Sequence, residues 1–556
     1  MTRPRIVDAG ATLALSRRTM HLRCPPGMAL ARPCITANLG RIFSYYTFRK
    51  VQVYSLYMTN TEFDAIVIGS GPGGTSCATL LQKRGIRTLP VEKNDLLGGK
   101  MISIEKDGYA YDLFPHGQVP MTQPAFYQIY EELGVVDEWA PALAADDPRD
   151  IIRIAYRARD WKEYREVMQG QAMEDSTPFF KLWDIPESEQ ERIMEFMTGM
   201  LMMEEEELRE LDDVTMHDYL ISHDVPDAIY SYLAFHANAS LAEAIDRVSA
   251  SEQILIMQQM MLEGGGGQYK GGFGQMTKVM IREFEKNGGT LIRQNRVERI
   301  LIENGVAAGV VTAKGTFRAP VVVSSAGLQP TVLKLIEPQH LEQSYRDYVA
   351  GLEPGWAFTS IRYFLKEPVM DVAMYVTYSD DSWWNKERFD RCVAGETPEE
   401  VILFMVNHSF YDENAAPPGK QVLVSGTICP PDPDSDQIEA LWKVMDEQMV
   451  KLFPKIWEAT ERREYSGPRD ISKLARDSVL PGHGGECVGL GQIAGQCGQF
   501  KPKSKSPIPG VYFSGADAGA AGMGTHQSAL SGMAVADMVV DYLAELRANR
   551  KAAASG

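Results

Sequence analysis

The chain has few cysteines and no long hydrophobic run. Its cysteines form no C-x-x-C pair and no paired spacing; the seven are Cys24, Cys34, Cys77, Cys392, Cys429, Cys487 and Cys497. This pattern argues against a disulfide framework, a zinc ribbon and a thioredoxin-like centre, and it fits a reducing compartment. No stretch approaches eighteen consecutive apolar residues, so we predict no membrane-spanning helix. We expect a cytoplasmic protein without a metal site, and peripheral contact with a membrane stays open.

Positive charge is scarce after the first 57 residues. Residues 1–57 contain nine Arg or Lys and a single acid, Asp8, which gives this leader a net charge of +8. The rest of the chain carries −26, and the two sum to the total net charge of −18. Two interpretations of this leader stay open: an organelle transit peptide, or a misplaced start with translation beginning at Met58. We exclude it from the fold in either case. The acidic remainder argues against a nucleic-acid partner, because phosphate binding needs a basic surface.

Several catalytic and structural signatures are missing from the sequence. It contains no Ser-His-Asp or H-E-x-x-H pattern, and no period of 20 to 50 residues repeats. No second complete G-x-G-x-x-G follows a predicted strand, so nothing indicates a separate NAD(P)H domain. We therefore expect electrons to be exchanged with oxygen, a quinone or a diffusible donor, and the sequence does not distinguish these.

A glycine loop stands in a nucleotide-binding context in the segment DAIVIGSGPGGTSCATLLQKRGIRTLPVEKN, residues 64–94. The apolar run 65–68 predicts a short buried strand, and a helical pattern over 75–85 follows the loop. Gly69 makes the tight turn, Gly71 lets the backbone approach a pyrophosphate, and Gly74 lets the helix lie close to the strand. The helix N-terminus offers free N–H groups and a positive dipole to the phosphates.

A carboxylate follows the second predicted strand. Residues 87–91 form this strand, and Glu92 ends it where an acidic side chain accepts hydrogen bonds from ribose hydroxyls. A carboxylate there would repel a 2′-phosphate, which disfavours NADP. Strand, loop, helix, strand and terminal Glu together predict a dinucleotide-binding unit rather than an ordinary glycine turn.

Further nucleotide-binding signals lie in the middle and at the end of the chain. Residues 122–262 look mostly helical, and 264–324 predict a Gly loop, a helix at 275–287, a hairpin turning at Asn304 and Gly305, and a buried strand. Several β-rich runs occupy 355–429, and an amphipathic helix at 437–453 follows them. The block at 506–543 reads as strand, Gly-rich loop and helix. The nucleotide-binding domain is therefore predicted to be discontinuous.

Together these stretches resemble the phytoene desaturase, carotenoid isomerase and retinol saturase group within the flavin amine oxidase-like superfamily. The matching segments are the 64–100 stretch, DGYAYDLFPHG, YKGGFGQMTKVMIREFEKNGGTLIRQNRVERILIENGVAAGVV, VVVSSAGLQPT and SPIPGVYFSGADAGAAGMGTHQSALSGMAVADMV. Two departures are visible. Many members have Arg where this chain has Lys100, and many have a Pro-Gly-Gly-type turn where it reads DAGAAGMGTHQ.

The resemblance implies FAD as the cofactor. It assigns the segment along the cofactor to Gly98, Gly99 and Lys100, the backbone near the adenine to Val297, and the C-terminal loop near the ribityl chain to Gly515 and Asp517. The helix that follows would aim its N-terminus at the flavin, whose reduced form accumulates negative charge. The full set of candidate cofactor-binding residues is Gly69, Ser70, Gly71, Pro72, Gly73, Gly74, Glu92, Lys93, Gly98, Gly99, Lys100, Val297, Gly515, Asp517 and Gly524.

Candidates for proton transfer are two histidines. His116, in DLFPHG, and His526, in GMGTHQ, lie in segments that the family places near flavin or substrate, although a loop histidine satisfied by backbone explains each more simply. Tyr109 and Tyr111 could donate a proton, but in an alternating strand they are more often packing residues. Met-rich segments at 193–211 and 254–263 suggest either ordinary core or a plastic apolar wall for a long flexible ligand.

The predicted fold class is α/β, with a discontinuous Rossmann-like FAD-binding domain and an inserted α+β substrate-binding domain. The predicted boundaries are a leader at 1–57, an FAD-binding domain at 58–121, 264–330 and 470–546, a substrate domain at 122–263 and 331–469, and a disordered tail at 547–556.

The predicted activity is that of an FAD-dependent oxidoreductase acting on carbon–carbon bonds of a hydrophobic, isoprenoid- or polyene-like small molecule. Desaturation, saturation and isomerisation stay open, each by hydride exchange with flavin N5. One alternative is an amine oxidase or a protoporphyrinogen oxidase-like enzyme, and an aromatic cage beside the flavin would favour the amine reaction. Another is a non-enzymatic, prenyl-binding escort protein of the same architecture. The retained Glu92 and the loop 515–517 argue against the escort.

Overall fold

The computed structural model describes residues 63–114, 119–120, 124–144, 147–170, 176–261, 266–522 and 524–555. The leader 1–57, Met58 and His116 lie outside these residues. Among the described residues, no helix combines the length and the apolar character needed to cross a bilayer.

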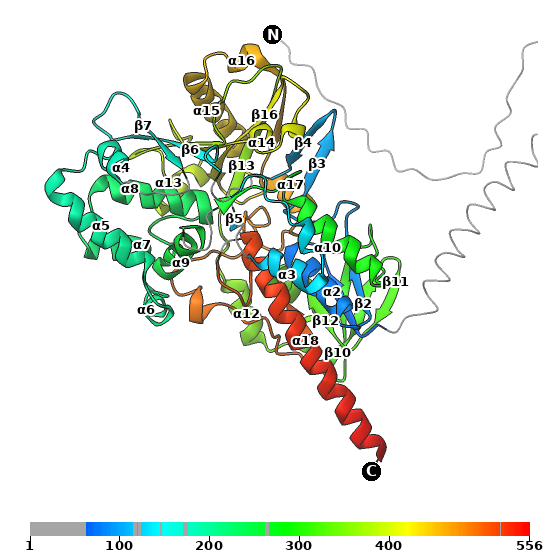
Figure 1. The fold of residues 1–556 in the computed structure, drawn as a ribbon. Coiled ribbons are helices and arrows are strands. Elements are labelled where there is room, and N and C mark those ends of the chain that lie inside the picture. The colour runs from blue at the N-terminus through cyan, green and yellow to red at the C-terminus, as the bar shows by residue number, and fades with distance from the viewer. Residues whose placement is uncertain are drawn as a thin grey trace, which may run out of the picture. The chain divides into compact units, whose positions relative to one another are not determined.

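A parallel four-stranded sheet holds the predicted glycine loop (Figure 1). Its order is β18-β12-β1-β2, and all neighbouring strands are parallel. The strands are β1 (Ala65–Ile68), β2 (Thr88–Val91), β12 (Val322–Ser324) and β18 (Val511–Phe513). Each is a short, fully buried apolar run, as expected for a parallel sheet covered on both faces. The predicted discontinuous Rossmann-like sheet is thereby confirmed.

Four helices cover one face of this sheet (Figure 1). They are α2 (Pro72–Lys83), α3 (Ala125–Leu133), α10 (Gly274–Lys286) and α18 (Gly524–Ser555). Buried side chains of all four share one hydrophobic cluster with Ala65 and Val67 of β1. The contact between α2 and α18 is close at Gly532, where an added Cβ would lie 2.5 Å from the carbonyl oxygen of Gly73.

An antiparallel three-stranded sheet packs on the opposite face. It consists of β9 (Val297–Glu303), β10 (Val306–Thr312) and β11 (Gly315–Arg318), in the order β11-β10-β9. Asn304 and Gly305, both with positive φ, form the predicted hairpin turn between β9 and β10. Apolar residues of these strands share a cluster with Ile66 and Ile68 of β1.

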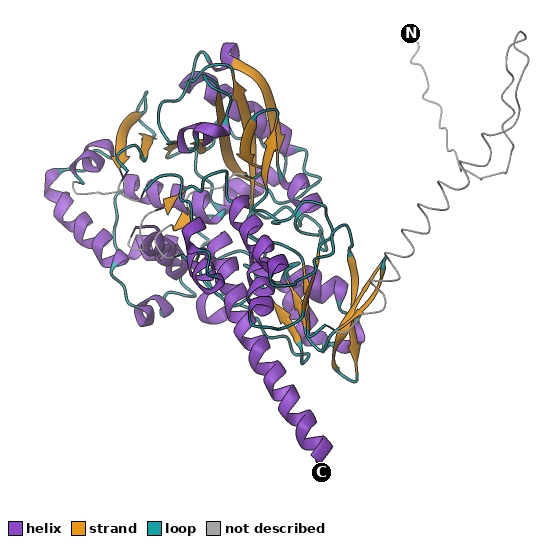
Figure 2. Ribbon diagram, turned by 45° about the vertical axis from the view of Figure 1, so that its right-hand side comes forward, coloured by secondary structure: helices purple, strands orange, loops and turns teal. Residues whose placement is uncertain are grey.

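A mixed seven-stranded sheet forms the second large layer (Figure 2). Its order is β17-β13-β16-β15-β14-β6-β7, with only β14 and β6 parallel. The strands are β6 (Ile151–Arg157), β7 (Arg165–Gly170), β13 (Ala357–Leu365), β14 (Met374–Ser379), β15 (Leu403–Asn407), β16 (Gln421–Cys429) and β17 (Thr460–Ser466). Two small sheets pair β3 (Ser103–Lys106) with β4 (Tyr109–Asp112), and β5 (Val119–Pro120) with β8 (Gly266–Gly267).

The region 122–262 contains most of the helices beside this sheet. They are α4 (Thr177–Leu182), α5 (Glu187–Leu201), α6 (Glu205–Arg209), α7 (Met216–Ser222), α8 (Asp227–His236), the π-helical turn η2 (Ala237–Leu241) and α9 (Ala250–Met261). The prediction of a mostly helical region misses β6 and β7. These strands form because β6 pairs with β14, more than 200 residues later, and local periodicity does not reveal such a partner.

The remaining described helices are short or peripheral. They are η1 (Val136–Glu138), α11 (Leu328–Pro330), η3 (Thr331–Leu335), η4 (Pro338–His340), α12 (Gln343–Gly351), α13 (Lys386–Val393), α14 (His408–Tyr411), η5 (Glu413–Ala415), α15 (Gln437–Leu452), α16 (Ile456–Ala459), α17 (Pro468–Leu474) and η6 (Gly498–Phe500).

Two departures from the predicted organisation concern chain segments without motifs. Helix α3 and the stretch 331–352 pack in the hydrophobic clusters around the parallel sheet, although the sequence assigns both to the substrate domain. The tail 547–556 was predicted to be disordered, whereas α18 continues to Ser555. Its Lys and Ala residues have high helix propensity and extend a helix that is already formed. The other predicted domain boundaries stay predictions.

Candidate functional site

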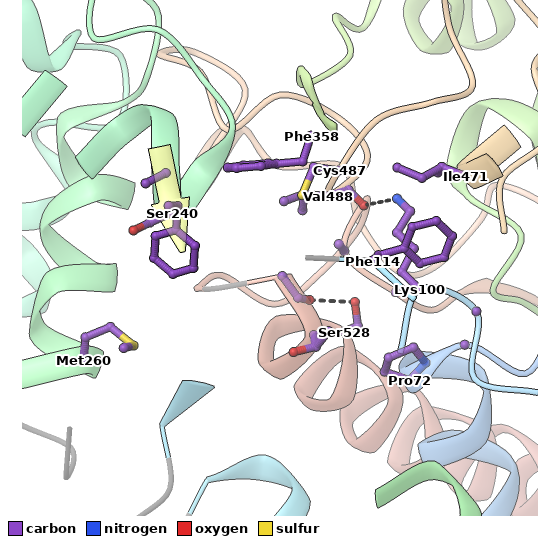
Figure 3. Close-up of a pocket in the computed structure, with 18 of the residues that line it drawn as sticks. Pro72, Lys100, Phe114, Ser240, Met260, Phe358, Ile471, Cys487, Val488 and Ser528 are labelled. Carbon is purple, nitrogen blue, oxygen red and sulfur yellow. Dashed lines mark hydrogen bonds between the residues drawn. The ribbon is translucent and has the colours of Figure 1, made fainter. Parts of the chain in front are cut away.

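A cavity of about 870 Å³ runs from the glycine loop into the helical region (Figure 3). At one end its wall is made of the loop 69–73 and of residues that follow β2, β12 and β18. At the other end the wall is apolar and belongs to the seven-stranded sheet and to α4, α5, α8 and α9. The first end lies at the carboxyl edge of the parallel strands, where ligands of open α/β sheets bind.

Most of the predicted cofactor-binding residues line this cavity. Those on the wall are Gly69, Ser70, Gly71, Pro72, Gly73, Glu92, Lys93, Gly99, Lys100, Val297, Gly515, Asp517 and Gly524. Gly74 and Gly98 do not line the cavity. They lie behind its wall, where the missing side chain allows close backbone packing. An added Cβ at Gly74 would lie 2.3 Å from the carbonyl oxygen of Gly69, so this glycine lets α2 start against the loop.

The loop leaves open space at Gly71. An added Cβ there would meet only Ser325 Oγ, 4.0 Å away, and φ is −65°. Gly71 is also the N-cap of α2, and no side chain caps that end. Gly73 differs, since its Cβ would lie 2.8 Å from the backbone nitrogen of Gly515. The backbone at Gly71 is therefore free to approach a ligand, while Gly73 joins the two loops.

Glu92 is buried and holds the loop. Its Oε2 accepts hydrogen bonds from the backbone N–H of Ser70 at 2.9 Å and from Ser70 Oγ at 2.8 Å, and its Oε1 accepts from the backbone N–H of Asn94 at 2.8 Å. The carboxylate lines the cavity with its remaining lone pairs. It therefore supports the loop in addition to the ribose contact that the sequence suggests.

Lys100 is a partly buried cation on the cavity wall. Its Nζ donates to the carbonyl oxygen of Val488 at 3.0 Å, as Figure 3 shows. Burial, together with repulsion from Arg476, lowers the pKa of Lys100 to about 8. Gly99, with φ +59°, brings this segment against Gly71, since its Cβ would lie 3.0 Å from the Gly71 Cα.

Asp517 fixes the C-terminal loop through Arg476. Its Oδ2 accepts from Arg476 at 2.7 Å and from the backbone N–H of Leu328 at 2.7 Å, and its Oδ1 accepts from the N–H of Leu490 at 3.0 Å. Arg476 also pairs with buried Glu486 at 3.1 Å. The Asp517 carboxylate thus joins three chain segments at the cavity wall.

A cluster of cations surrounds Asp477 beside the glycine loop. Lys93, Arg296 and Lys334 contact its carboxylate at 2.8, 2.5 and 2.8 Å. Burial raises its pKa, but hydrogen bonds from these three cations dominate and hold the pKa of Asp477 well below its usual range. All four side chains line the cavity, so three cations and one anion give this part of the wall a positive excess.

The first turn of α18 reaches the cavity, but His526 does not lie on the wall. Gly524, Thr525 and Ser528 line it, with Ser528 near the centre of Figure 3. His526 is 4% exposed, and burial lowers its pKa to about 4, so the ring is neutral at pH 7. The structure therefore gives His526 no contact with the cavity.

Tyr109 and Tyr111 pack rather than line the cavity. Their rings stand edge-on to Phe364, with centroids 4.9 and 5.2 Å away, and the Tyr111 hydroxyl donates to Glu464 at 2.9 Å. This agrees with the packing interpretation made from the sequence.

The apolar end of the cavity is rich in methionine and aromatic side chains. Met194 and Met197 come from α5, and the 257–261 stretch of α9 adds three more methionines. The aromatic residues here are Phe179, Phe180, Trp183, Tyr232, Phe235 and Phe404. These methionines line the cavity, and several of them also belong to or pack against a hydrophobic core cluster, so both interpretations of the Met-rich segments stay open. We call this end of the cavity the chamber.

Sequence reasoning missed several polar residues of the wall, Asp477 and Ser240 among them. Arg296, Lys334 and Arg476 contribute charge, and His236 lines the chamber. Arg296 directly precedes Val297, so the motif that identified Val297 could also have identified Arg296. Lys334, Arg476 and His236 lie in segments without a recognised pattern, and only the fold brings them to the cavity. The described residues contain no group of three His, Cys, Asp or Glu side chains suited to a metal ion.

The fold and cavity together define a flavin-binding oxidoreductase of the Rossmann type. The family model for flavin containing amine oxidoreductases matches residues 73–540. The chain belongs to this family, and it is an FAD-dependent oxidoreductase.

Curated relatives are similar at low identity over most of the chain. The chain is 23% identical to prolycopene isomerase of Daucus carota, over 86% of this chain and 80% of that protein. It is 23% identical to the lycopene-forming phytoene desaturase of a Paracoccus strain, over 84% and 93%. It is 23% identical to human all-trans-retinol 13,14-reductase, over 86% of each chain.

Solved structures share the fold. An oxidoreductase from Methanosarcina mazei aligns with a TM-score of 0.65 and 17% identity, over 85% of this chain and 99% of that chain. Cyclohexylamine oxidase from Brevibacterium oxydans aligns with a TM-score of 0.56 and 13% identity, over 87% and 99%.

The residues present fit FAD. The open space at Gly71 and the uncapped start of α2 suit a pyrophosphate, and the cations around Asp477 suit its charge. The first turn of α18 offers a second helix N-terminus on the wall.

Proposed function

We propose that this enzyme acts on carbon–carbon bonds of a hydrophobic, isoprenoid- or polyene-like substrate. The observation that carries the proposal is the single cavity, which continues from the glycine loop into the methionine-rich chamber. The three curated relatives are named for an isomerisation, a desaturation and a reduction. The direction of the reaction is therefore left open among desaturation, saturation and isomerisation.

The proposed roles of the residues follow from where they line the cavity. Gly69, Gly71, Gly73 and Gly99 would admit the pyrophosphate, Glu92 the ribose, and Val297 the adenine. Gly98 and Gly74 would act by close packing, and Asp517 by holding the loop beside Gly515. Bound FAD supplies hydride exchange at N5.

The chamber contributes alignment and the exclusion of water. Hydride transfer needs reacting atoms about 3–3.5 Å apart, and an unbranched thioether adapts to a long chain better than a rigid side chain does. Apolar walls such as Met197 and Phe235 would hold an extended chain with one bond presented to the cofactor end. No proton donor is assigned here, because His526 is neutral and off the wall.

The test is an anaerobic flavin titration of the full chain loaded with FAD. We expect the visible flavin absorbance to be bleached by dithionite and restored by a conjugated polyene or enone, with free FAD as the control. Bleaching of the oxidised protein by a partly saturated isoprenoid would indicate desaturation. A changed double-bond geometry of the polyene, with no net change in the flavin absorbance, would indicate isomerisation.

Two results would contradict the proposal. Bleaching of the oxidised protein by amines, with no response to any polyene, would identify an amine oxidase. Protein that stays colourless after incubation with FAD would remove the enzymatic function altogether.

A further inference from the structure

The chamber contains a polar pair that the proposed chemistry does not use. It lies where α8 ends and the π-helical turn η2 begins, and it consists of His236 and Ser240. Single π-helical turns occur often at functional sites, because the extra residue redirects neighbouring side chains. Figure 3 shows Ser240 on the same side of the cavity as Met260, across from Lys100 and Pro72.

The turn is held in place from outside the cavity. Asn238, which is fully buried, donates from Nδ2 to the carbonyl oxygens of Glu243 at 2.8 Å and Trp384 at 3.0 Å. Its Oδ1 accepts from the backbone N–H of Trp384 at 2.6 Å. Ala242, with φ +53°, ends the turn. Residues 236 and 240 are therefore presented to the chamber by a rigid backbone.

The hydrogen bonding of the pair is incomplete. His236 Nε2 lies 3.4 Å from Ser240 Oγ, which is a long contact, and His236 Nδ1 is buried without a partner. Burial lowers the pKa of His236 to about 4, so the ring is neutral at pH 7 and offers one donor and one acceptor. The Ser240 hydroxyl thus has spare hydrogen-bonding capacity on a mostly apolar wall, and leaving it unsatisfied beneath a bound ligand is costly.

We infer that the Ser240 hydroxyl, oriented by His236, binds a single hydroxyl or carbonyl oxygen on an otherwise apolar isoprenoid substrate. The inference rests on the proposed function and narrows its substrate class from hydrocarbons to oxygen-bearing chains. A hydrocarbon would leave the desolvated Ser240 hydroxyl with its long contact to His236 alone, whereas an alcohol supplies both a donor and an acceptor. Ser240 is the contact and His236 is a positioning residue.

The test compares two ligands that differ in one oxygen. All-trans-retinol and the hydrocarbon in which hydrogen replaces its hydroxyl bind the FAD-loaded full chain in the absence of an electron donor, and Trp183 on the cavity wall reports binding by fluorescence. We expect the alcohol to bind at least about tenfold more tightly. Ser240→Ala and His236→Phe should each reduce this ratio to about one to threefold while leaving hydrocarbon binding intact. Ser240→Thr, which keeps the hydroxyl, should restore the preference.

Thr198→Val is the matched control, because Thr198 also lines the chamber and the exchange removes a hydroxyl at nearly constant volume. It should leave the ratio unchanged. Equal binding of both ligands to the wild type, or a ratio that falls in Thr198→Val and not in Ser240→Ala, would overturn the inference while the proposed function stands. If neither ligand binds and no polyene reoxidises the reduced flavin, the proposed function fails as well.

Discussion

Two glycines of the nucleotide loop, three positions apart, have opposite surroundings and predict opposite defects. In Gly71→Ala the new Cβ enters open space at an allowed φ, so the fold should persist. The same Cβ would occupy the space that the pyrophosphate needs, and we expect the FAD dissociation constant to rise at least about 100-fold. Flavin content after dialysis and the melting temperature of the apoprotein measure the two effects separately.

Gly74→Ala is the comparison variant. Its Cβ would lie 2.3 Å from the carbonyl oxygen of Gly69, and backbone must move to accept it. We expect the apoprotein to lose about 2 kcal/mol or more of unfolding free energy. Stoichiometric FAD in Gly71→Ala, or an unchanged melting temperature in Gly74→Ala, would contradict this division of roles.

Because the pKa of Lys100 is lowered, we expect the affinity for FAD to depend on pH. In the apoprotein its pKa lies near 8, so the ammonium loses its proton as the pH rises through that value. Anionic phosphates favour the charged form, and FAD binding above pH 8 must therefore take up a proton. We expect the dissociation constant to rise about tenfold between pH 7.5 and 9.5, equivalent to about 1.4 kcal/mol.

Two variants test whether Lys100 causes this dependence. Lys100→Arg keeps a charge that does not titrate in this range and should make the affinity independent of pH. Lys100→Met should bind weakly throughout. Equal pH profiles for the wild type and Lys100→Arg would assign the dependence to another group.

At the residue scale, motifs were a good guide to the backbone and a poor one to side-chain chemistry. The glycine loop and Glu92 were identified because their spacing follows directly from phosphate and ribose geometry. His526 was considered because it neighbours a motif, yet helix geometry turns it away from the wall. His236 belongs to no recognised motif. It reaches the chamber only because α8 packs on the seven-stranded sheet.

The packing of α18 on α2 leaves no room for a side chain at Gly532. In Gly532→Ala the new Cβ would lie 2.5 Å from the Gly73 carbonyl oxygen and 2.9 Å from Ser76 Cβ. We expect a loss of about 1–3 kcal/mol in unfolding free energy, together with weaker FAD binding, because both helices begin at the cavity. Urea unfolding and flavin content provide the measurement.

Gly199→Ala is the control for helix propensity. Gly199 lies in α5, and nothing stands within 4 Å of its added Cβ. This exchange should stabilise the protein by up to about 1 kcal/mol. If both variants change stability in the same direction, the close contact at Gly532 is not the cause.

At the element scale, buried strands beside the loop were predictable and paired strands elsewhere were not. The apolar run 65–68 matches β1, and the helices at 275–287 and 437–453 match α10 and α15 to within one residue. β6 depends on a partner far along the chain, so its alternating pattern was hidden in a helical neighbourhood. The end of α18 shows the opposite error, since the tail 547–556 was predicted to be disordered and the helix continues to Ser555.

On the scale of the whole molecule, Asp477 joins the segment after α17 to the cofactor end of the cavity. In Asp477→Asn we expect unfolding free energy at pH 7 to fall by about 1–2 kcal/mol, because Arg296 and Lys334 are half exposed and solvent screens them. A depressed carboxyl pKa stabilises the fold above the unfolded value of about 4 and loses that effect at lower pH.

The difference between the wild type and Asp477→Asn should therefore narrow as the pH falls below 4. Denaturant titrations at several pH values measure it. Asp434→Asn is the control, since Asp434 is 90% exposed and pairs loosely with Arg469 at 3.6 Å. A constant difference down to pH 3, or an equal loss in Asp434→Asn, would show that the charge cluster is not responsible.

Much of the whole-molecule layout followed from the order of motifs along the chain. Nucleotide signals at the start, middle and end predicted one sheet assembled from separate stretches, which β1, β2, β12 and β18 form. The packing of α3 and of 331–352 beside that sheet was not predictable. The apolar face of an amphipathic helix shows that the helix packs on something, but not on which sheet. The continuity of the cavity with the chamber likewise emerges only when the layers meet.

The strand order of the parallel sheet also determines when, during translation, the sheet can be completed. Its edge strand β18 starts at Val511, which is 443 positions after the end of β1 at Ile68. At about 5–20 residues per second, a ribosome needs roughly 20–90 seconds to cover that interval. During this time β12 lacks its edge neighbour β18, and the loop 514–517 and the first turn of α18 are missing from the cavity wall. The cofactor cradle is completed only when translation is nearly finished, and flavin loading is therefore among the last steps in the maturation of this protein.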